Sequence, residues 1–134
     1  MPKRLKVAAT RITTSSLPVV SLKKALDSSE ELQITVTGRK SGKKITLPIW
    51  FVRDGEKLLL LPVQGSETNW YRNIKHSPTM GIFAGGTSIT VKARPTTSTE
   101  GAEAVADKFR AKYGAADVKK YYSKFDASVE VTLT

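Results

Sequence analysis

The sequence predicts a mainly β protein: a small barrel of about six mostly antiparallel strands, with helices inserted after the third and fifth strands. From Leu32 onward, apolar and polar residues alternate with a period of two in several segments, which is typical of strands. Asp54-Gly55 and Gly85-Gly86 separate such segments and are typical hairpin turns. Long apolar strands without an evident solvated face favour closure into a barrel, because closure removes unpaired edges.

Composition limits the class of protein. The 134 residues fit one domain, and 40% hydrophobic with 25% charged residues is typical of a globular chain. The absence of Cys excludes a disulfide framework and a thiolate metal site, so we expect a cytoplasmic location. The longest apolar run, residues 58–63, is too short to cross a bilayer, and the first residues lack an apolar signal core.

The charge is strongly positive and unevenly placed. The net charge is +10, and residues 1–44 contain 10 Lys or Arg but only 3 Asp or Glu. Such an excess is compatible with a polyanionic partner, namely nucleic acid, acidic lipid or a phosphorylated small molecule. It is also compatible with a simple role in solubility.

Residues 1–30 are predicted to form a basic N-terminal helical segment that precedes a β domain over residues 31–134. Four apolar residues at helical spacing lie among cations, which indicates a short amphipathic helix (Leu5, Ala8, Ala9, Ile12). This helix could contact a membrane surface, fold back as a lid or stay disordered. Pro18 is expected to end it, and residues 21–26 are expected to add a further turn or two.

The first two predicted strands, residues 32–37 and 45–52, flank a basic turn over residues 37–44. Gly38 and Gly42 permit a tight backbone, and exposed amides next to cations can hold a phosphate. The turn is therefore a candidate anion-binding site. Its cations are Arg39, Lys40, Lys43 and Lys44.

The third predicted strand, residues 58–63, is continuously apolar and should be buried on both faces. Thr68 or Asn69 is expected to cap a short helix over residues 70–74, which Ser77-Pro78 ends. Strands are then expected over residues 80–84 and 87–94 on either side of the glycine pair.

The last part of the chain predicts a helix packed on the sheet. Thr97 and Glu100 resemble a capping box, and Gly114 is expected to end the helix. One or two helical turns over residues 117–124 and a final strand over residues 129–133 follow. The residues of the expected apolar helix face are Ala102, Val105, Ala106, Phe109 and Tyr113.

The sequence does not support catalysis by a metal site or by paired carboxylates. His76 is the only histidine, so a His-rich metal site is excluded, and the acidic residues are dispersed. The sequence contains no phosphate-binding Walker loop and no dinucleotide-binding glycine pattern. What remains is chemistry carried by a bound organic cofactor, or binding without catalysis.

Three motifs together resemble the deazaflavin-dependent nitroreductases, a family of six-stranded split β-barrels related to FMN-binding proteins. They are residues 37–43 (TGRKSGK), residues 48–55 (PIWFVRDG) and residues 69–74 (NWYRNI) followed by Ser77-Pro78. The resemblance covers roughly residues 32–134. Two features depart from it: Ile45 stands where relatives often have an arginine, and the loop over residues 63–69 is shorter than in many relatives.

The resemblance implies binding of the deazaflavin coenzyme F-420, with FMN as the alternative cofactor. It implies a phosphate site at Arg39, Lys40, Ser41 and Gly42, with Lys43 and Lys44 attracting the acidic tail of the coenzyme. The implied pocket wall consists of Leu47, Pro48, Ile49, Trp50, Gln64, Gly65, Trp70 and Asn73. The implied substrate-facing residues are Tyr113, Tyr121 and Tyr122.

The activity that the resemblance implies is hydride transfer from the reduced coenzyme to a small electron-poor acceptor: a quinone, a nitro compound or an activated alkene. No protein nucleophile and no metal are needed, and relatives often form homodimers. The rival is a non-catalytic binder of nucleic acid or anionic lipid. Specific nucleic-acid binding is disfavoured, because the aromatic residues are not interleaved with the cations.

Overall fold

The structure, a computed structural model, describes residues 13–133. Within them the chain forms eight strands, four α-helices and one short 3-10 helix. The elements are α1 (Thr13–Asp27), β1 (Glu31–Thr37), β2 (Lys44–Trp50), β3 (Val52–Asp54), β4 (Lys57–Leu60), η1 (Gly65–Glu67), α2 (Asn69–His76), β5 (Thr79–Ala84), β6 (Thr87–Lys92), β7 (Arg94–Thr97), α3 (Thr99–Tyr113), α4 (Ala115–Tyr121) and β8 (Ala127–Thr132).

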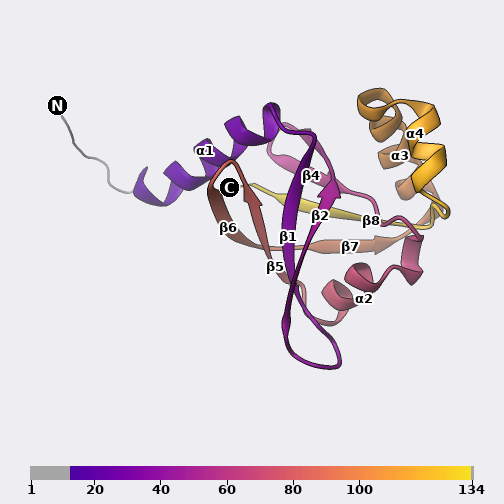
Figure 1. The fold of residues 1–134 in the computed structure, drawn as a ribbon, viewed down its shortest axis with the longest axis horizontal. Coiled ribbons are helices and arrows are strands. Elements are labelled where there is room, and N and C mark those ends of the chain that lie inside the picture. Colours follow the sequence, from indigo (N-terminus) through magenta and orange to yellow (C-terminus); the bar gives the residue numbers. More distant parts are fainter. Residues whose placement is uncertain (1–12, 134) are drawn as a thin grey trace.

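The strands form two four-stranded sheets with the orders β2-β1-β5-β6 and β3-β4-β8-β7. Every pair of neighbouring strands within them is antiparallel. Helix α1 lies on one side of the sheets and the α3–α4 pair on the other, as Figure 1 shows. The prediction of a mainly β, antiparallel protein with helical insertions is confirmed.

The prediction of six strands in a closed barrel is wrong in strand count and closure. The segment predicted as one strand over residues 45–52 divides at Phe51 into β2 and β3, and the segment over residues 87–94 divides at Ala93 into β6 and β7. Each half belongs to a different sheet. Bends of this kind connect two sheets whose strands cross.

Other hydrogen-bond partners take over the backbone at both bends. The Phe51 N–H donates to the Tyr113 hydroxyl at 3.1 Å, and the Phe51 carbonyl accepts from Lys112 Nζ at 2.9 Å. The Ala93 N–H donates to the Pro78 carbonyl at 2.8 Å. Because buried backbone groups need partners, these contacts satisfy the groups that each strand leaves unpaired where it departs from its ladder.

The hydrophobic residues form two clusters. The larger one fills the space between the sheets and includes Ile34, Leu58 and Ile82, and the smaller one lies beneath α3 and α4 around Phe109 and Val118. Strand β4 contributes to both clusters, with Leu58 and Leu60 in the first and Leu59 in the second. The prediction that this strand is buried on both faces is confirmed.

Helix α1 continues through Pro18, so the predicted break there is wrong. Proline inside a helix costs about 3 kcal/mol. Leu22 and Leu26 are buried in the larger cluster, and full burial of two leucines contributes a comparable free energy, about 1.5–3 kcal/mol each. The predicted amphipathic helix around Leu5–Ile12 lies outside the described residues.

The predictions for α3 are confirmed except at its start. Ser98, not Thr97, is the N-cap, and its side chain accepts a hydrogen bond from the Gly101 N–H. Thr97 instead pairs its hydroxyl with that of Tyr71 at 2.9 Å. Gly114 ends the helix with a φ of 94°, in the region that favours glycine. Ala102, Val105, Ala106 and Phe109 are buried as expected.

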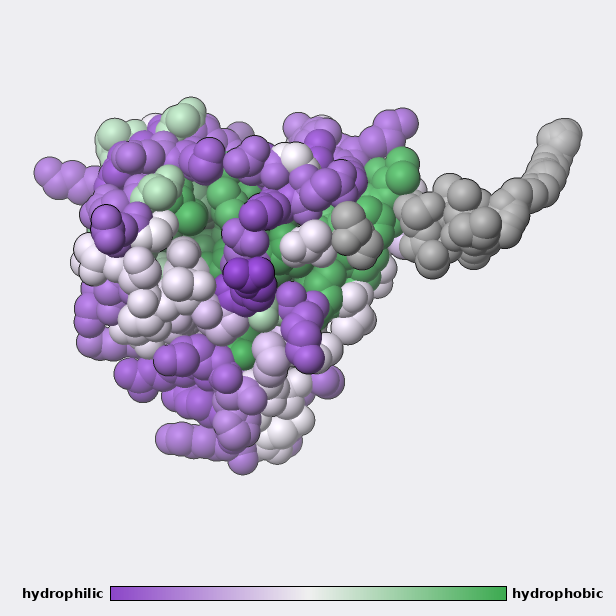
Figure 2. Space-filling model, turned by 180° about the vertical axis from the view of Figure 1, so that it is seen from behind, coloured by the Kyte–Doolittle hydropathy of each residue, from purple (hydrophilic) through white to green (hydrophobic). Residues whose placement is uncertain are grey.

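An apolar groove of about 620 Å³ lies between α1 and β6 and is separate from the site described below. Figure 2 shows the molecule from behind, with hydrophobic side chains exposed among hydrophilic ones. None of the helices within residues 13–133 is both long enough and apolar enough for a membrane span.

Candidate functional site

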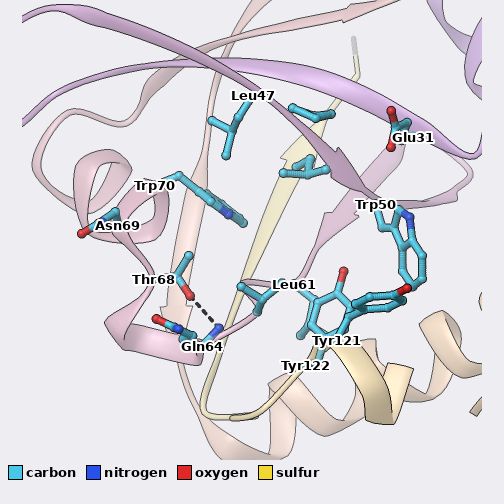
Figure 3. A pocket seen from close by; sticks show the side chains of 13 residues that line it. Glu31, Leu47, Trp50, Leu61, Gln64, Thr68, Asn69, Trp70, Tyr121 and Tyr122 are labelled. Atoms are coloured by element: carbon cyan, nitrogen blue, oxygen red, sulfur yellow. Dashed lines mark hydrogen bonds between the residues drawn. The ribbon is translucent and has the colours of Figure 1, made fainter. Parts of the chain in front are cut away.

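A cleft of about 660 Å³ lies beside strand β2, between helix α2 and helix α4. Figure 3 shows Asn69 and Trp70 on one side of it and Trp50 with Glu31 on the opposite side. A cleft of this size is large enough for a flat organic ligand. Its lining residues are Glu31, Leu47, Pro48, Ile49, Trp50, Leu61, Val63, Gln64, Thr68, Asn69, Trp70, Tyr121 and Tyr122.

Strand β2 supplies one wall through four consecutive residues, 47–50. The strand lies at the edge of its sheet, where Pro48 is tolerated because its missing N–H removes no central ladder bond. Within residues 13–133, one edge of β2 therefore lacks a neighbouring strand. Backbone and side chains of an edge strand are accessible to a ligand.

Trp50 is held by aromatic contacts. Its ring stacks on that of Tyr113, with ring centroids 4.1 Å apart and planes within 8°, and Tyr121 meets it edge-on at 5.6 Å. Aromatic pairs of this geometry add stability beyond simple burial. The indole of Trp50 is thus fixed at the edge of the cleft before any ligand binds.

Tyr113 lies behind Trp50 and does not line the cleft. Its hydroxyl accepts from the Phe51 N–H and lies 2.6 Å from the Glu30 carbonyl oxygen. Burial raises the pKa of Tyr113 to about 12. Its hydroxyl therefore stays protonated and holds the bend at Phe51 in place.

Tyr121 and Tyr122 line the cleft as the sequence implied. Tyr121 is half exposed, whereas Tyr122 is only 6% exposed and also packs against Phe109. Burial raises the pKa of the Tyr122 hydroxyl far above its ordinary value, with a smaller contribution from Tyr113. Tyr122 is consequently a neutral hydrogen-bond donor at every physiological pH.

The wall opposite β2 is built by the segment from Leu61 to Trp70. The Thr68 hydroxyl accepts a hydrogen bond from the Gln64 N–H at 2.8 Å, the dashed line in Figure 3. Asp126 accepts hydrogen bonds from the Ser66 N–H at 2.8 Å and from the Ser66 hydroxyl at 2.6 Å. These bonds to Ser66 hold the pKa of Asp126 below its ordinary value.

Gly65 does not line the cleft but shapes its wall. Its φ is 57°, and a side chain there would collide with the Asp126 carboxylate. Only glycine therefore permits the turn that places Gln64 and Thr68 at the cleft.

The basic turn lies at the α2 end of the cleft and is tied to that helix by Arg39. The Arg39 backbone N–H and Nη1 both donate to Asn73 Oδ1, at 3.1 and 2.8 Å. The guanidinium group also lies 3.4 Å from the carbonyl oxygen and from Oδ1 of Asn69, which lines the cleft. Asn73 is buried and does not line the cleft; its side-chain oxygen bonds instead to Arg39 of the turn.

The other cations of the turn form no ion pair with an acid within residues 13–133. Lys40 and Lys43 are exposed, and the Lys44 ammonium donates to the Thr37 hydroxyl at 2.8 Å. Within the turn, the Gly38 and Gly42 amides bond to backbone carbonyls and the Lys43 amide bonds to the Ser41 hydroxyl. The turn is therefore preformed, but fewer of its amides are free than the sequence suggested.

Sequence reasoning missed five residues of the cleft: Glu31, Leu61, Val63, Thr68 and Asn69. A signal existed for two of them. Glu31 pairs with Trp50 in the register of β1 and β2, and Asn69 precedes Trp70 at the start of α2. Within residues 13–133 no group of three or more His, Cys, Asp or Glu side chains is placed to hold a metal ion.

Comparison with known proteins adds a family and a fold. The model of a family described as "uncharacterized protein conserved in bacteria (DUF2255)" matches residues 22–133. An F-420-H2-dependent reductase, FDR-A, has a similar structure, with 24% identity, a TM-score of 0.59 and coverage of 76% of this chain and 93% of that chain.

Two further solved structures have the same fold. One, described as a domain-swapped dimer, has 20% identity and a TM-score of 0.59, with coverage of 88% of this chain and 98% of that chain. The other is the heme storage protein HutZ from Vibrio cholerae, with 14% identity, a TM-score of 0.62 and coverage of 86% of this chain and 89% of that chain. The fold is thus shared by proteins that differ in what they bind.

Proposed function

The chain belongs to the DUF2255 family and has the split-barrel fold of flavin and deazaflavin proteins, and on this basis we propose that it is a deazaflavin-dependent reductase. Its cofactor would be coenzyme F-420. Its substrate would be a small electron-poor acceptor, such as a quinone, a nitro compound or an activated alkene.

One observation carries this proposal: a turn with four cations lies at one end of an aromatic-lined cleft and is joined to it through Arg39 and Asn69. The cleft suits a flat ring system, and the turn suits a phosphate or an acidic tail attached to that ring. None of the four cations forms an ion pair with an acid in the described part of the chain. Their charge is therefore available to an anionic ligand.

The residues present fit the coenzyme. Lys40, Lys43 and Lys44, together with Arg39 at the cleft, would hold its anionic groups. Trp70 and the wall over residues 47–50 would contact its rings. When bound, the reduced coenzyme supplies a hydride.

This chain's own groups then bind the acceptor and exclude water. An acceptor that gains one hydride and one proton is reduced by two electrons, so that a quinone becomes a hydroquinone. Tyr122 has a protonated hydroxyl and lines the cleft, so it is placed to donate a hydrogen bond to the acceptor. Water can supply the proton that the product retains.

Titration of the protein with coenzyme F-420 and, separately, with FMN tests the proposal through quenching of the fluorescence of Trp50 and Trp70. We expect saturable binding of F-420 and weaker binding of FMN. The double variant Lys40→Ala/Lys43→Ala should weaken F-420 binding about tenfold, because it removes two cations of the turn. Lys92→Ala, in β6 and apart from the cleft, is the control of equal charge type.

The same titration distinguishes the rival functions. Tight binding of FMN without F-420 would favour a flavin reductase or oxidase on the same fold. Binding of neither, with salt-sensitive binding of nucleic acid or of anionic vesicles, would favour a non-catalytic binder.

We also propose that the chain forms a homodimer, since a protein of the same fold has been solved as a domain-swapped dimer. Light scattering coupled to gel filtration would give the mass of one or two chains. Contact of the basic N-terminus with membranes remains a proposal that concerns residues outside the described part.

A further inference from the structure

The two ends of the cleft differ in charge. Asn69, at one side, contacts Arg39 of the basic turn. Glu31, at the opposite side, is the one acidic residue among the cleft-lining residues in the part of the chain that the structure describes. Any ligand whose anionic group is held at the turn therefore presents its other end to a carboxylate.

The Glu31 carboxylate is available to a ligand. It forms no ion pair with any residue of the described part of the chain. Glu31 is the first residue of β1 and pairs with Trp50, whose ring is fixed against Tyr113. Its backbone is thus held by the sheet while its side chain lines the cleft.

We propose that Glu31 selects the electron acceptor by charge, an inference that rests on the proposed reductase function. A neutral or cationic ring is accepted at the end of the cleft formed by Trp50, Tyr121 and Glu31. A ring that carries a carboxylate or sulfonate is disfavoured, because two like charges across a partly desolvated cleft repel one another.

The physical effect is local. Two charges about 10 Å apart at an effective dielectric constant near 20 correspond to roughly a tenfold difference in affinity, and the effect shrinks as salt screens the charges. The cations at the far end act on the anionic part of the coenzyme and not on the acceptor. The end of the cleft at the basic turn therefore binds an anionic group, whereas the end at Glu31 disfavours one.

The test compares 4-nitrobenzamide with 4-nitrobenzoate, which have nearly the same shape and differ in charge. Saturable quenching of tryptophan fluorescence in the full chain, with oxidised F-420 present so that the cations of the turn are occupied, gives the two Kd values, and kcat/KM with reduced F-420 gives a second comparison. The wild type should prefer the amide about tenfold at low salt, and Glu31→Gln should reduce this preference to about twofold or less.

Glu30→Gln is the matched control, because it removes the same charge from the neighbouring residue. The Glu30 charge acts on Lys112 and Tyr113, and Glu30 does not line the cleft. The proposal requires that this variant keep the preference for the amide. Thermal unfolding should be cooperative in both variants.

Equal Kd values in the wild type, absence of saturable binding, or a preference that survives in Glu31→Gln would overturn the proposal. Equal loss in both variants would also overturn it, because the effect would then belong to net charge. The reductase function is tested separately. If the chain binds the amide more tightly but reduces neither compound, the selection by charge is supported and the reductase function is contradicted.

Discussion

At the scale of single residues, the two asparagines of α2 connect the basic turn to the cleft. Asn73 is 5% exposed, and its Oδ1 accepts both the Arg39 amide and the Arg39 guanidinium. One buried oxygen thus fixes the backbone and the side chain of the first cation in the turn. Asn69 brings the same guanidinium to the edge of the cleft.

Asn73→Ala should therefore loosen the turn. It leaves two donors of Arg39 without their shared acceptor, and an unsatisfied buried group costs about 1–3 kcal/mol. We expect lower stability in urea and F-420 affinity reduced about tenfold. Asn69 lies at the cleft and accepts only longer hydrogen bonds from Arg39, so Asn69→Ala should lower the stability less. Unchanged coenzyme affinity in Asn73→Ala would contradict the role of Asn73 in positioning the turn.

Tyr113→Phe separates the hydroxyl from the ring. The ring stack on Trp50 remains, but the contacts of the hydroxyl with Phe51 and Glu30 are lost, at a cost of about 1–3 kcal/mol in unfolding free energy. Because the folded-state pKa of about 12 lies above the ordinary value of 10, the neutral hydroxyl stabilises the fold fully below pH 10. This contribution is lost as the pH rises from 10 to 12.

Urea unfolding of the wild type and of Tyr113→Phe at pH 8, 10 and 12 measures this loss of stability and its dependence on pH. The difference in unfolding free energy between the two proteins should narrow at alkaline pH. A difference that does not change with pH would contradict the role of the neutral Tyr113 hydroxyl. Tyr121→Phe is the control, since the Tyr121 side chain is exposed.

At the scale of elements, the wall over residues 61–70 depends on the segment between α4 and β8. The Ser123 N–H donates to the Val63 carbonyl at 2.8 Å, and Asp126 holds Ser66 through two hydrogen bonds. Of the two tyrosines of the cleft, Tyr121 directly precedes this segment and Tyr122 is its first residue. One short segment therefore positions two walls of the cleft together.

Asp126→Asn tests this dependence. The amide keeps one acceptor oxygen but loses the charge that Ser66 and Lys124 stabilise, so hydrogen exchange should accelerate at residues 64–68 while α3 stays protected. The lowered pKa of Asp126 also makes the stability of this wall depend on pH. The ionised carboxylate stabilises the wall fully above its ordinary pKa, and this stabilisation is lost as the pH falls through the lowered pKa. The wall should therefore be less sensitive to acid in the variant. Equal hydrogen exchange at residues 64–68 in the wild type and in Asp126→Asn would contradict the role of Asp126 in holding this wall.

The elements also show what sequence can predict. The two hairpin turns and the apolar face of α3 depend on local residue types, and each is found where the pattern places it. The bends at Phe51 and Ala93 do not depend on local residue types. The bend at Phe51 is held by Tyr113 and Lys112, and the bend at Ala93 is held by Pro78, and these partners are not sequence neighbours of the bends. The continuity of α1 through Pro18 likewise depends on burial of Leu22 and Leu26 against the sheets.

The same contrast holds for the cleft. Most of the β2 wall and Trp70 could be inferred because they lie within motifs that resemble a known family, and Gln64 was implied by the resemblance as a whole. Thr68 and Leu61 could not, because they reach the cleft only through the path of the chain around η1, whereas Glu31 could have been inferred from its pairing with Trp50 in the hairpin. Nor did the motif indicate that Asn73 lies outside the cleft, since only the fold brings Arg39 to its side chain.

At the scale of the whole molecule, charge and shape indicate the same kind of ligand. The net charge of +10 includes four cations in one preformed turn, and that turn lies beside the aromatic cleft. A ligand held mainly by these cations should bind less tightly as salt increases, since exposed charges are screened over about 10 Å at 0.1 M salt. Binding through the rings alone would show little dependence on salt.

The most direct measurement is therefore the affinity of the full chain for coenzyme F-420 as a function of salt, read from the quenching of tryptophan fluorescence. The account predicts saturable binding that weakens with added salt, and that weakens about tenfold in Lys40→Ala/Lys43→Ala but not in Lys92→Ala. Absence of saturable F-420 binding at low salt, or binding that none of these changes affects, would contradict the assignment of the basic turn and the cleft to a deazaflavin.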